Sequence, residues 1–141
     1  MHIRKLTDQV SVSPQILPGE MADLEVAGFR SVINNRPDGE AEDQPASAEM
    51  AQAAAANGLA YRHIPVVPGQ FGEDLIGAMA AALDELPAPV LAFCRTGTRS
   101  TTLWALQAAR ANEPDALVKA AGEAGYDIAA LAPRLRAMRR G

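Results

Sequence analysis

The sequence predicts a single α/β domain, residues 1–141, with a central, mostly parallel sheet flanked by helices. Short apolar segments alternate with helical segments along the first hundred residues. The apolar segments show little polar alternation, which is typical of strands buried on both faces of a parallel sheet. With 141 residues, 48% of them hydrophobic, the chain suits one domain that can bury a real core.

The strands are predicted from runs of β-branched and alternating residues that end in turn signals. A turn at Asp8-Gln9 separates the first two, and Pro37-Asp38-Gly39 ends the third. Pro68-Gly69 breaks the fourth, and the fifth is apolar except for its cysteine. The expected ranges are 3–7, 10–15, 29–36, 60–67 and 90–94.

The helices are predicted from their start and stop residues. Pro18-Gly19-Glu20 precedes the first helix, and Gly28 closes it. The second helix is rich in alanine and ends at Asn57-Gly58, and Pro87-Ala88-Pro89 ends the third. After the fifth strand the chain is all helical. The expected ranges are 21–28, 45–57, 73–86, 100–111, 114–124 and 128–138.

Composition argues against several classes of function. The formal charge is -4 and no Lys/Arg stripe is sustained, so we expect no nucleic-acid partner. No apolar run approaches the roughly 20 residues that cross a bilayer, and no secretion signal is visible, which favours a cytoplasmic protein without a membrane partner. One cysteine and two histidines make a metal site improbable, and no phosphate-binding glycine motif indicates a nucleotide, so we expect no cofactor.

The segment FCRTGTRS (93–100) lies between a buried strand and a helix, where α/β proteins bind ligands. The unpaired N–H groups and the dipole of a helix N-terminus attract an anion. Glycine permits the backbone of such a turn, hydroxyls can donate to an anion, and arginine can hold an oxyanion with two parallel bonds. The expected anion-binding residues of this turn are Arg95, Thr96, Gly97, Thr98, Arg99 and Ser100.

Cys94 opens this turn and is the candidate nucleophile. A free thiol has a pKa near ~8.5, and a helix N-terminus with cationic neighbours favours the reactive thiolate. The alternative is a small buried hydrophobe, the usual role of a lone cysteine at a strand end. We favour the nucleophile, because two arginines beside an inert buried cysteine would be costly without an anion.

A second set of candidates follows the third strand. Arg36, an expected anion-binding residue, and Asp38 come just beyond its end, at the same sheet edge as Cys94 if the strands are parallel. Asp38 is a candidate for holding Arg36 or Arg99 through a charged hydrogen bond, and for a displaced general acid. The alternative is that Asp38 only forms a turn. We expect His63 to be structural and Trp104 to lie in the core.

Two family resemblances bear on the chemistry. The pattern Cys-x-x-Gly-x-Arg-Ser resembles the active-site loop of rhodanese sulfurtransferases. The chain as a whole is similar to a small bacterial family, the phosphatase-like domain of beta-lactamase-hydrolase-like proteins. That second resemblance implies a fold similar to tyrosine and dual-specificity phosphatases. It rests on GFRSVINNRPDGEAEDQP (28–45), YRHIPV (61–66) and FCRTGTRSTTLWAL (93–106).

The loop departs from the phosphatase signature His-Cys-x5-Arg-Ser/Thr in three ways. Arg99 comes one residue early, so that Ser100 occupies the position where the signature has its arginine. Phe93 replaces the histidine, and Pro68 stands where the resemblance places the general acid. The acids left as substitutes are Asp38, Glu40, Asp43, Glu73 and Asp74.

Sulfur transfer makes less demand on such an acid, because the leaving sulfite or thiolate is already a stable anion. The sequence therefore favours a cysteine-dependent sulfurtransferase. In this prediction Cys94 becomes a persulfide, and a thiol acceptor removes the sulfur. The expected partners are a small anionic sulfur donor, such as thiosulfate or a persulfide, and a thiol acceptor. The family resemblance implies a further partner, a sulfide- or persulfide-oxidising enzyme. The alternatives are a cysteine-based phosphatase with a phosphocysteine intermediate and a non-catalytic anion-binding module.

Overall fold

The structure is a computed structural model that describes residues 1–140. Five strands form one sheet in the order β1-β2-β5-β3-β4. Strands β2, β5, β3 and β4 are parallel, and only β1 runs antiparallel, to β2. The predicted mostly parallel α/β domain is therefore confirmed. The strands are β1 (Arg4–Lys5), β2 (Val10–Ser13), β3 (Ser31–Asn34), β4 (Ala60–His63) and β5 (Val90–Phe93).

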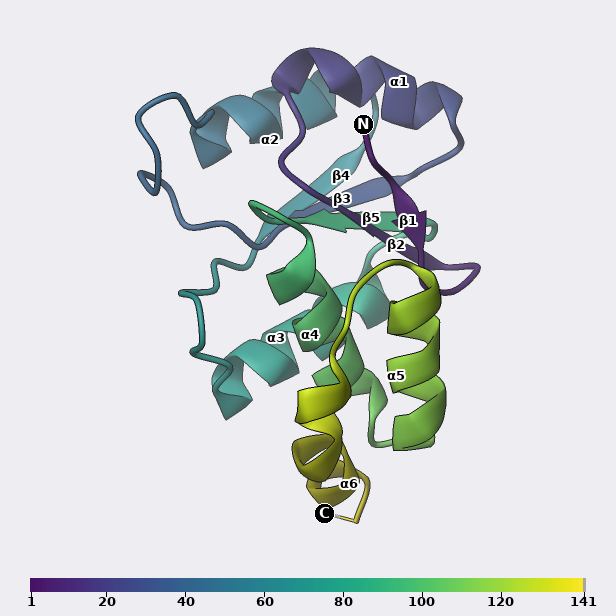
Figure 1. The fold of residues 1–141 in the computed structure, drawn as a ribbon. Helices are drawn as coiled ribbons and strands as arrows, with labels where there is room; N and C mark the ends of the chain where they lie inside the picture. The colour runs from purple at the N-terminus through teal and green to yellow at the C-terminus, as the bar shows by residue number, and fades with distance from the viewer. Residues whose placement is uncertain (141) are drawn as a thin grey trace.

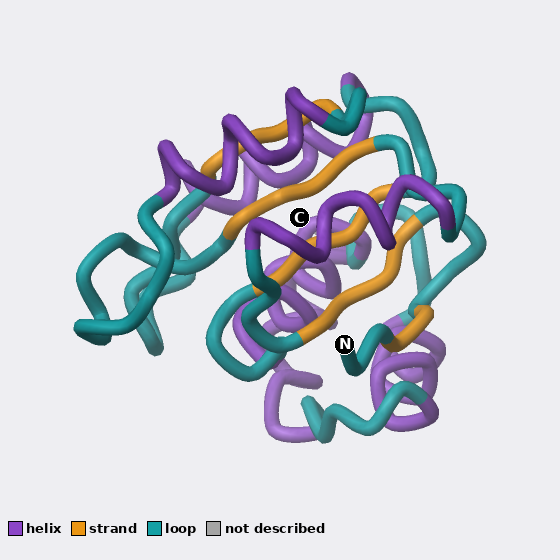
Figure 2. Tube along the Cα trace, turned by 90° about the horizontal axis from the view of Figure 1, so that it is seen from above, coloured by secondary structure: helices purple, strands orange, loops and turns teal. Residues whose placement is uncertain are grey.

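Helices cover both faces of the sheet (Figure 1). One face carries α1 (Met21–Val26), which follows the 3-10 turn η1 (Pro18–Glu20), and α2 (Ser47–Ala56). The view from above shows helices stacked over the strands (Figure 2). The other face carries α3 (Glu73–Glu85), α4 (Thr98–Ala108), α5 (Pro114–Glu123) and, after the turn η2 (Ala129–Leu131), α6 (Ala132–Arg140).

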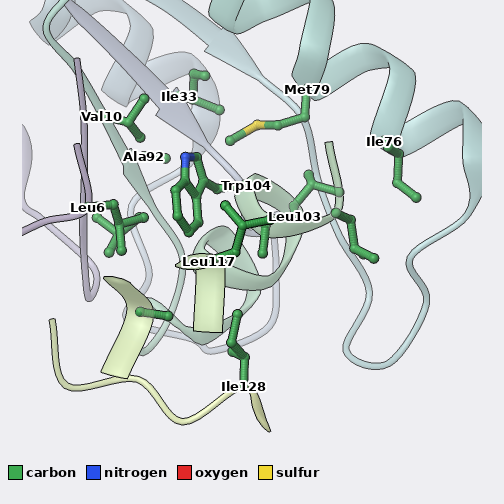
Figure 3. Close-up of a cluster of buried hydrophobic side chains, with 14 of the residues drawn as sticks. Leu6, Val10, Ile33, Ile76, Met79, Ala92, Leu103, Trp104, Leu117 and Ile128 are labelled. Carbon is green, nitrogen blue, oxygen red and sulfur yellow. The ribbon is translucent and has the colours of Figure 1, made fainter. Parts of the chain in front are cut away.

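Alternate residues of the central strands enter two separate cores. Val32, Leu91 and Phe93 pack with residues of α1 and α2. Ile33 and Ala92 point to the opposite face, where Trp104 and Leu103 of α4 fill the larger core (Figure 3). Full burial of each large apolar side chain contributes about 1.5–3 kcal/mol, so the two cores fix the sheet between its helical layers.

Three helix starts differ from the prediction. Helix α2 begins at Ser47, two residues late. Helix α4 begins at Thr98, two residues early, because Gly97 is its N-cap. The last helix begins at Ala132, four residues late, after η2. Its second residue is Pro133, which is tolerated in the first turn of a helix but would break a helix that began at residue 128.

The strand register brings the carboxyl ends of the parallel strands to one edge. Phe93 of β5 pairs with Ser13 of β2 and with Asn34 of β3, and Asn34 pairs with His63 of β4. The residues that follow these strand ends therefore meet at the edge from which the β5–α4 turn leaves.

Candidate active site

Cys94 follows β5 directly and is fully buried, with a relative exposure of 0%. The backbone N–H of Gly97 donates to its sulfur at 3.1 Å. Gly97 lies in the left-handed region, with φ +95°, a conformation that glycine adopts without strain. The turn therefore places the start of α4 over the sulfur, where N–H groups and the helix dipole favour negative charge.

The hydroxyl residues of the turn do not all face this site. Thr96 and Thr98 are exposed, and their hydroxyls bond to each other at 3.1 Å. Ser100 was predicted to bind the anion, but it is fully buried and donates to Oδ1 of Asn35 at 2.8 Å. Ser100 lies inside the first turn of α4, so its side chain points toward the strand ends rather than outward.

Arg99 is held at three points. Its Nη1 donates to Oε2 of Glu40 and to the carbonyl of Val66, both at 2.8 Å, and its Nη2 donates to Oε1 of Glu40 at 2.9 Å. A guanidinium has five N–H donors. The remaining two, on Nε and Nη2, share one edge of the group and form the parallel pair that suits an oxyanion.

The electrostatics place this guanidinium beside a negatively charged site. The hydrogen bond that Arg99 donates to Glu40 is the largest cause that raises the pKa of Arg99, and the charge of Cys94 raises it further. The hydrogen bond from Arg99 holds the pKa of Glu40 below its ordinary value, with Arg36 adding to the effect. Glu40 is therefore ionised at neutral pH.

Glu40 is the residue that joins the two arginines. Nε of Arg36 donates to Oε1 of Glu40 at 2.9 Å, and Nη1 of Arg36 donates to Oε1 of Gln15 at 3.1 Å. The side chain of Arg36 is 6% exposed, so its charge is compensated within the fold. Arg36 thus positions Glu40. Its side chain is engaged in these bonds and not in the anion binding that was predicted for it.

Asp38 does not hold either arginine, which corrects one of its predicted roles. Its Oδ1 accepts the backbone N–H of Ser47 at 2.8 Å, the first residue of α2. The N-cap residue of α2 is Ala46, whose side chain cannot cap, so Asp38 supplies the missing acceptor. The alternative prediction, that Asp38 only forms a turn, agrees better with these contacts.

The sequence analysis missed Asn35. This residue is fully buried, accepts the Ser100 hydroxyl, and donates from Nδ2 to the carbonyl of Ile64 at 3.0 Å. Its backbone N–H bonds to the carbonyl of Phe93 at 2.8 Å. Asn35 therefore ties the ends of β3 and β5 to α4. The polar pair Asn34-Asn35 at the end of an apolar strand was the signal available for it.

Tyr126 was missed as well. It lies between α5 and η2, and its hydroxyl donates to the carbonyl of Thr96 at 3.1 Å. A Cβ added to Gly97 would stand 2.1 Å from the Tyr126 oxygen, so the ring lies directly against the turn. Burial raises the pKa of Tyr126, and the charge of Cys94 raises it further.

The other acids considered lie elsewhere or make no contact with the turn. Glu73 pairs with Arg110 at 3.8 Å, beyond the end of α4 opposite to Cys94, and Asp74 follows Glu73 at the start of α3. Asp43 is exposed in the β3–α2 loop. Of the predicted anion-binding residues, Arg95 is exposed in the turn. Over residues 1–140, no three His, Cys, Asp or Glu side chains gather as a metal site requires.

The model of one protein family matches residues 2–111 of this sequence. Its description is the phosphatase-like domain of beta-lactamase hydrolase-like proteins. The chain belongs to this family. A beta-lactamase hydrolase-like protein of Agrobacterium fabrum is 35% identical over 102 residues, which are 72% of this chain. The matched part is only 24% of that relative, so the chain spans about a quarter of its length.

Solved structures extend the match over the whole chain. A phosphatase candidate from Neisseria meningitidis superposes with a TM-score of 0.87 at 30% identity, covering 99% of each chain. PTPMT1 superposes with a TM-score of 0.70, covering 98% of this chain and 94% of its own. Its identity is 14%, so this likeness shows the fold alone, that of the tyrosine and dual-specificity phosphatases. The fold expected from the family resemblance is confirmed.

These matches overturn the sulfurtransferase prediction. The family and its structural neighbours are of the phosphatase type, so the matches support the alternative reading of the cysteine turn. The prediction was wrong because it took the missing general acid and the short Cys94–Arg99 spacing to decide the reaction. Spacing along the chain does not report how the arginine is held.

Over residues 1–140, no helix is long and apolar enough to cross a membrane.

Proposed function

We propose that this protein is a cysteine-dependent phosphatase in which Cys94 is the nucleophile. The observation that carries the proposal is the arrangement at the start of α4. There the Gly97 N–H bonds to the Cys94 sulfur, and Arg99, fixed by Glu40 and Val66, keeps two parallel N–H donors for an oxyanion. The phosphatase-type family and fold support the same reading.

The reaction has two displacement steps at phosphorus. The Cys94 thiolate forms an S–P bond while the P–O bond to the leaving group breaks, and the leaving oxygen keeps the electron pair. Water then forms a P–O bond as the S–P bond breaks, which releases inorganic phosphate and regenerates the thiolate. Arg99 and the N–H groups of the turn hold the phosphoryl oxygens in both steps, where charge is spread over them.

Neither carboxylate engaged at this edge is poised to protonate the leaving oxygen. Glu40 is ionised between two arginines, and Asp38 caps α2. General acid catalysis typically contributes about 10²–10⁴-fold. We therefore expect phosphate esters with acidic leaving groups, such as nitrophenol, to be hydrolysed at least about 100-fold faster than alkyl phosphates. Comparable rates for the two classes would show that another residue supplies the proton.

The test of the proposal is phosphate release from an aryl phosphate by the wild type and by Cys94→Ser. We expect Cys94-dependent release, together with a phosphocysteine that can be trapped by acid quench and found on Cys94 by mass spectrometry. Cys94 is the only cysteine, so the label has one possible thiol site. Release that persists in Cys94→Ser would reject the mechanism. If inorganic phosphate binds but no ester turns over, the protein is an anion-binding module instead.

A further inference from the structure

The hydroxyl of Tyr126 and the sulfur of Cys94 bond to opposite ends of one peptide group. Tyr126 donates to the carbonyl oxygen of Thr96 at 3.1 Å, and the N–H of Gly97 donates to the Cys94 sulfur at 3.1 Å. That oxygen and that N–H belong to the same planar unit and point in opposite directions. A rotation of this unit would break both bonds together.

We propose that Tyr126 is a positioning residue that keeps the Thr96–Gly97 peptide turned with its N–H on the Cys94 sulfur, and so sustains the thiolate. The inference rests on the proposed function, in which that thiolate is the nucleophile. A hydrogen bond received by the carbonyl also polarises the peptide group, which makes its N–H a stronger donor to the sulfur. Tyr126 lies outside residues 2–111, the part of the chain that the family model matches.

The surroundings of Tyr126 are suited to this role because its backbone is fixed on both sides. The N–H of Tyr126 bonds to the carbonyl of Ala121 at 2.8 Å, just after Gly125 has turned the chain at the end of α5. Two residues later Ile128, which is 5% exposed, enters the larger core (Figure 3). The phenol is thus presented to the turn by a segment that is fixed to α5 and to the core.

Glycine at position 97 fits the same arrangement. Its positive φ provides the turn, and the absence of a Cβ leaves the space that the Tyr126 hydroxyl occupies. The ring therefore lies against the peptide that it bonds. A tyrosine that merely covered the protein surface would not need this close approach.

The charged groups around Cys94 come from three other segments, and Tyr126→Phe leaves all of them in place. They are Arg99 at the start of α4, Glu40 behind it from the β3–α2 loop, and Arg95 within the turn. Arg4 of β1 is near enough to lower the pKa of Tyr126. A change in the thiolate caused by Tyr126→Phe would therefore report the peptide and not a lost charge.

The test compares Tyr126→Phe with Tyr61→Phe in the full chain. The chain has two tyrosines, and Tyr61 is also partly buried, with its hydroxyl bonded to Asn34 and Ser47 on the α2 side of the sheet. The readouts are the ultraviolet absorbance of the thiolate as a function of pH, the rate of alkylation by iodoacetamide, and kcat and KM for an aryl phosphate. Thermal unfolding measures the stability of both variants.

The loss of one neutral hydrogen bond shifts an equilibrium about fivefold. We expect Tyr126→Phe to move the thiolate profile to higher pH. At a pH below the midpoint of that profile, kcat/KM should fall about fivefold. Tyr61→Phe should leave the profile in place even if the protein unfolds more easily. A Tyr126→Phe profile that coincides with the wild type overturns the inference, whatever its thermal stability.

The outcome is separable from that of the proposed function, because thiolate absorbance needs no turnover. A shifted profile in a protein that hydrolyses no ester would reject the phosphatase and keep Tyr126 as the residue that sets the thiolate. Turnover that depends on Cys94, with an unshifted Tyr126→Phe profile, would keep the phosphatase and reject the role of Tyr126.

Discussion

Glu40→Gln tests whether the position of Arg99 limits catalysis. The substitution keeps the size of the side chain, but an amide has one acceptor oxygen and its NH₂ group faces a guanidinium. The bidentate bond from Arg99 is lost, because only one of the two oxygen positions that Arg99 bridges can still accept. Arg99 remains attached to the carbonyl of Val66 by Nη1. The guanidinium is then held by one amide oxygen and by that carbonyl, and no longer by a bidentate pair.

The magnitude follows from these contacts. A hydrogen bond to a charged group contributes about 1.5–3 kcal/mol. Because one acceptor and the Val66 carbonyl remain, and because the Glu40 side chain is 21% exposed, we expect a net loss of about 1–2 kcal/mol in holding Arg99. Expressed in the transition state, this corresponds to a decrease in kcat/KM of about 5- to 30-fold.

The assay is steady-state hydrolysis of an aryl phosphate, with thermal unfolding of the same preparations. Glu85→Gln is the matched control. It breaks the ion pair with Arg62 on the surface, where Glu85 is 59% exposed, and should change kcat/KM by less than about twofold. An unchanged kcat/KM in Glu40→Gln would show that Arg99 finds phosphate without this anchor. An increase would show that Glu40 competes with phosphate for the guanidinium.

Three further predictions concern the same edge of the sheet. The depressed pKa of Glu40 adds stability that is present above the pKa of an unfolded glutamate and is lost as pH falls below about 4. The acid unfolding of Glu40→Gln, followed by circular dichroism, should therefore lack this component. Asp38→Ala should lower the unfolding free energy by about 1 kcal/mol because α2 loses its cap, and Asp38→Asn should be close to wild type. A large loss of kcat in folded Asp38→Asn would instead identify Asp38 as the general acid. Gly97→Ala should lower kcat/KM about tenfold or more through the strained φ and the contact with Tyr126, and full activity of this variant would refute the described turn.

The parts predicted well from sequence are those decided by neighbouring residues. Strand periodicity and turn residues place the five strands, and the parallel arrangement then brings Cys94 and Arg36 to one edge. Helix ends were less accurate, as α4 and α6 show. A glycine N-cap and a first-turn proline fix those starts, and both residues also occur where helices end.

The partners of the site residues could not be predicted, because contacts between distant segments depend on how the loops return to the sheet edge. Arg99 and Glu40 are 59 positions apart, and Tyr126 is 30 positions from Thr96. The turn Pro37-Asp38-Gly39-Glu40 offers two acids within three residues, and the sequence does not say which one faces inward. The structure assigns Asp38 to α2 and Glu40 to the arginines.

The same limit explains how loop length contributed to the wrong choice of reaction. Counting residues from Cys94 to Arg99 describes the backbone that separates them, whereas an oxyanion responds to the direction of the donors at the end of the side chain. Here that direction is fixed by Glu40 and by the carbonyl of Val66, neither of which belongs to the turn. A turn one residue shorter can therefore present a parallel pair of N–H donors, provided that the surrounding fold anchors the arginine. The fold, which supplies those anchors, carries more information about the chemistry than the spacing within the motif.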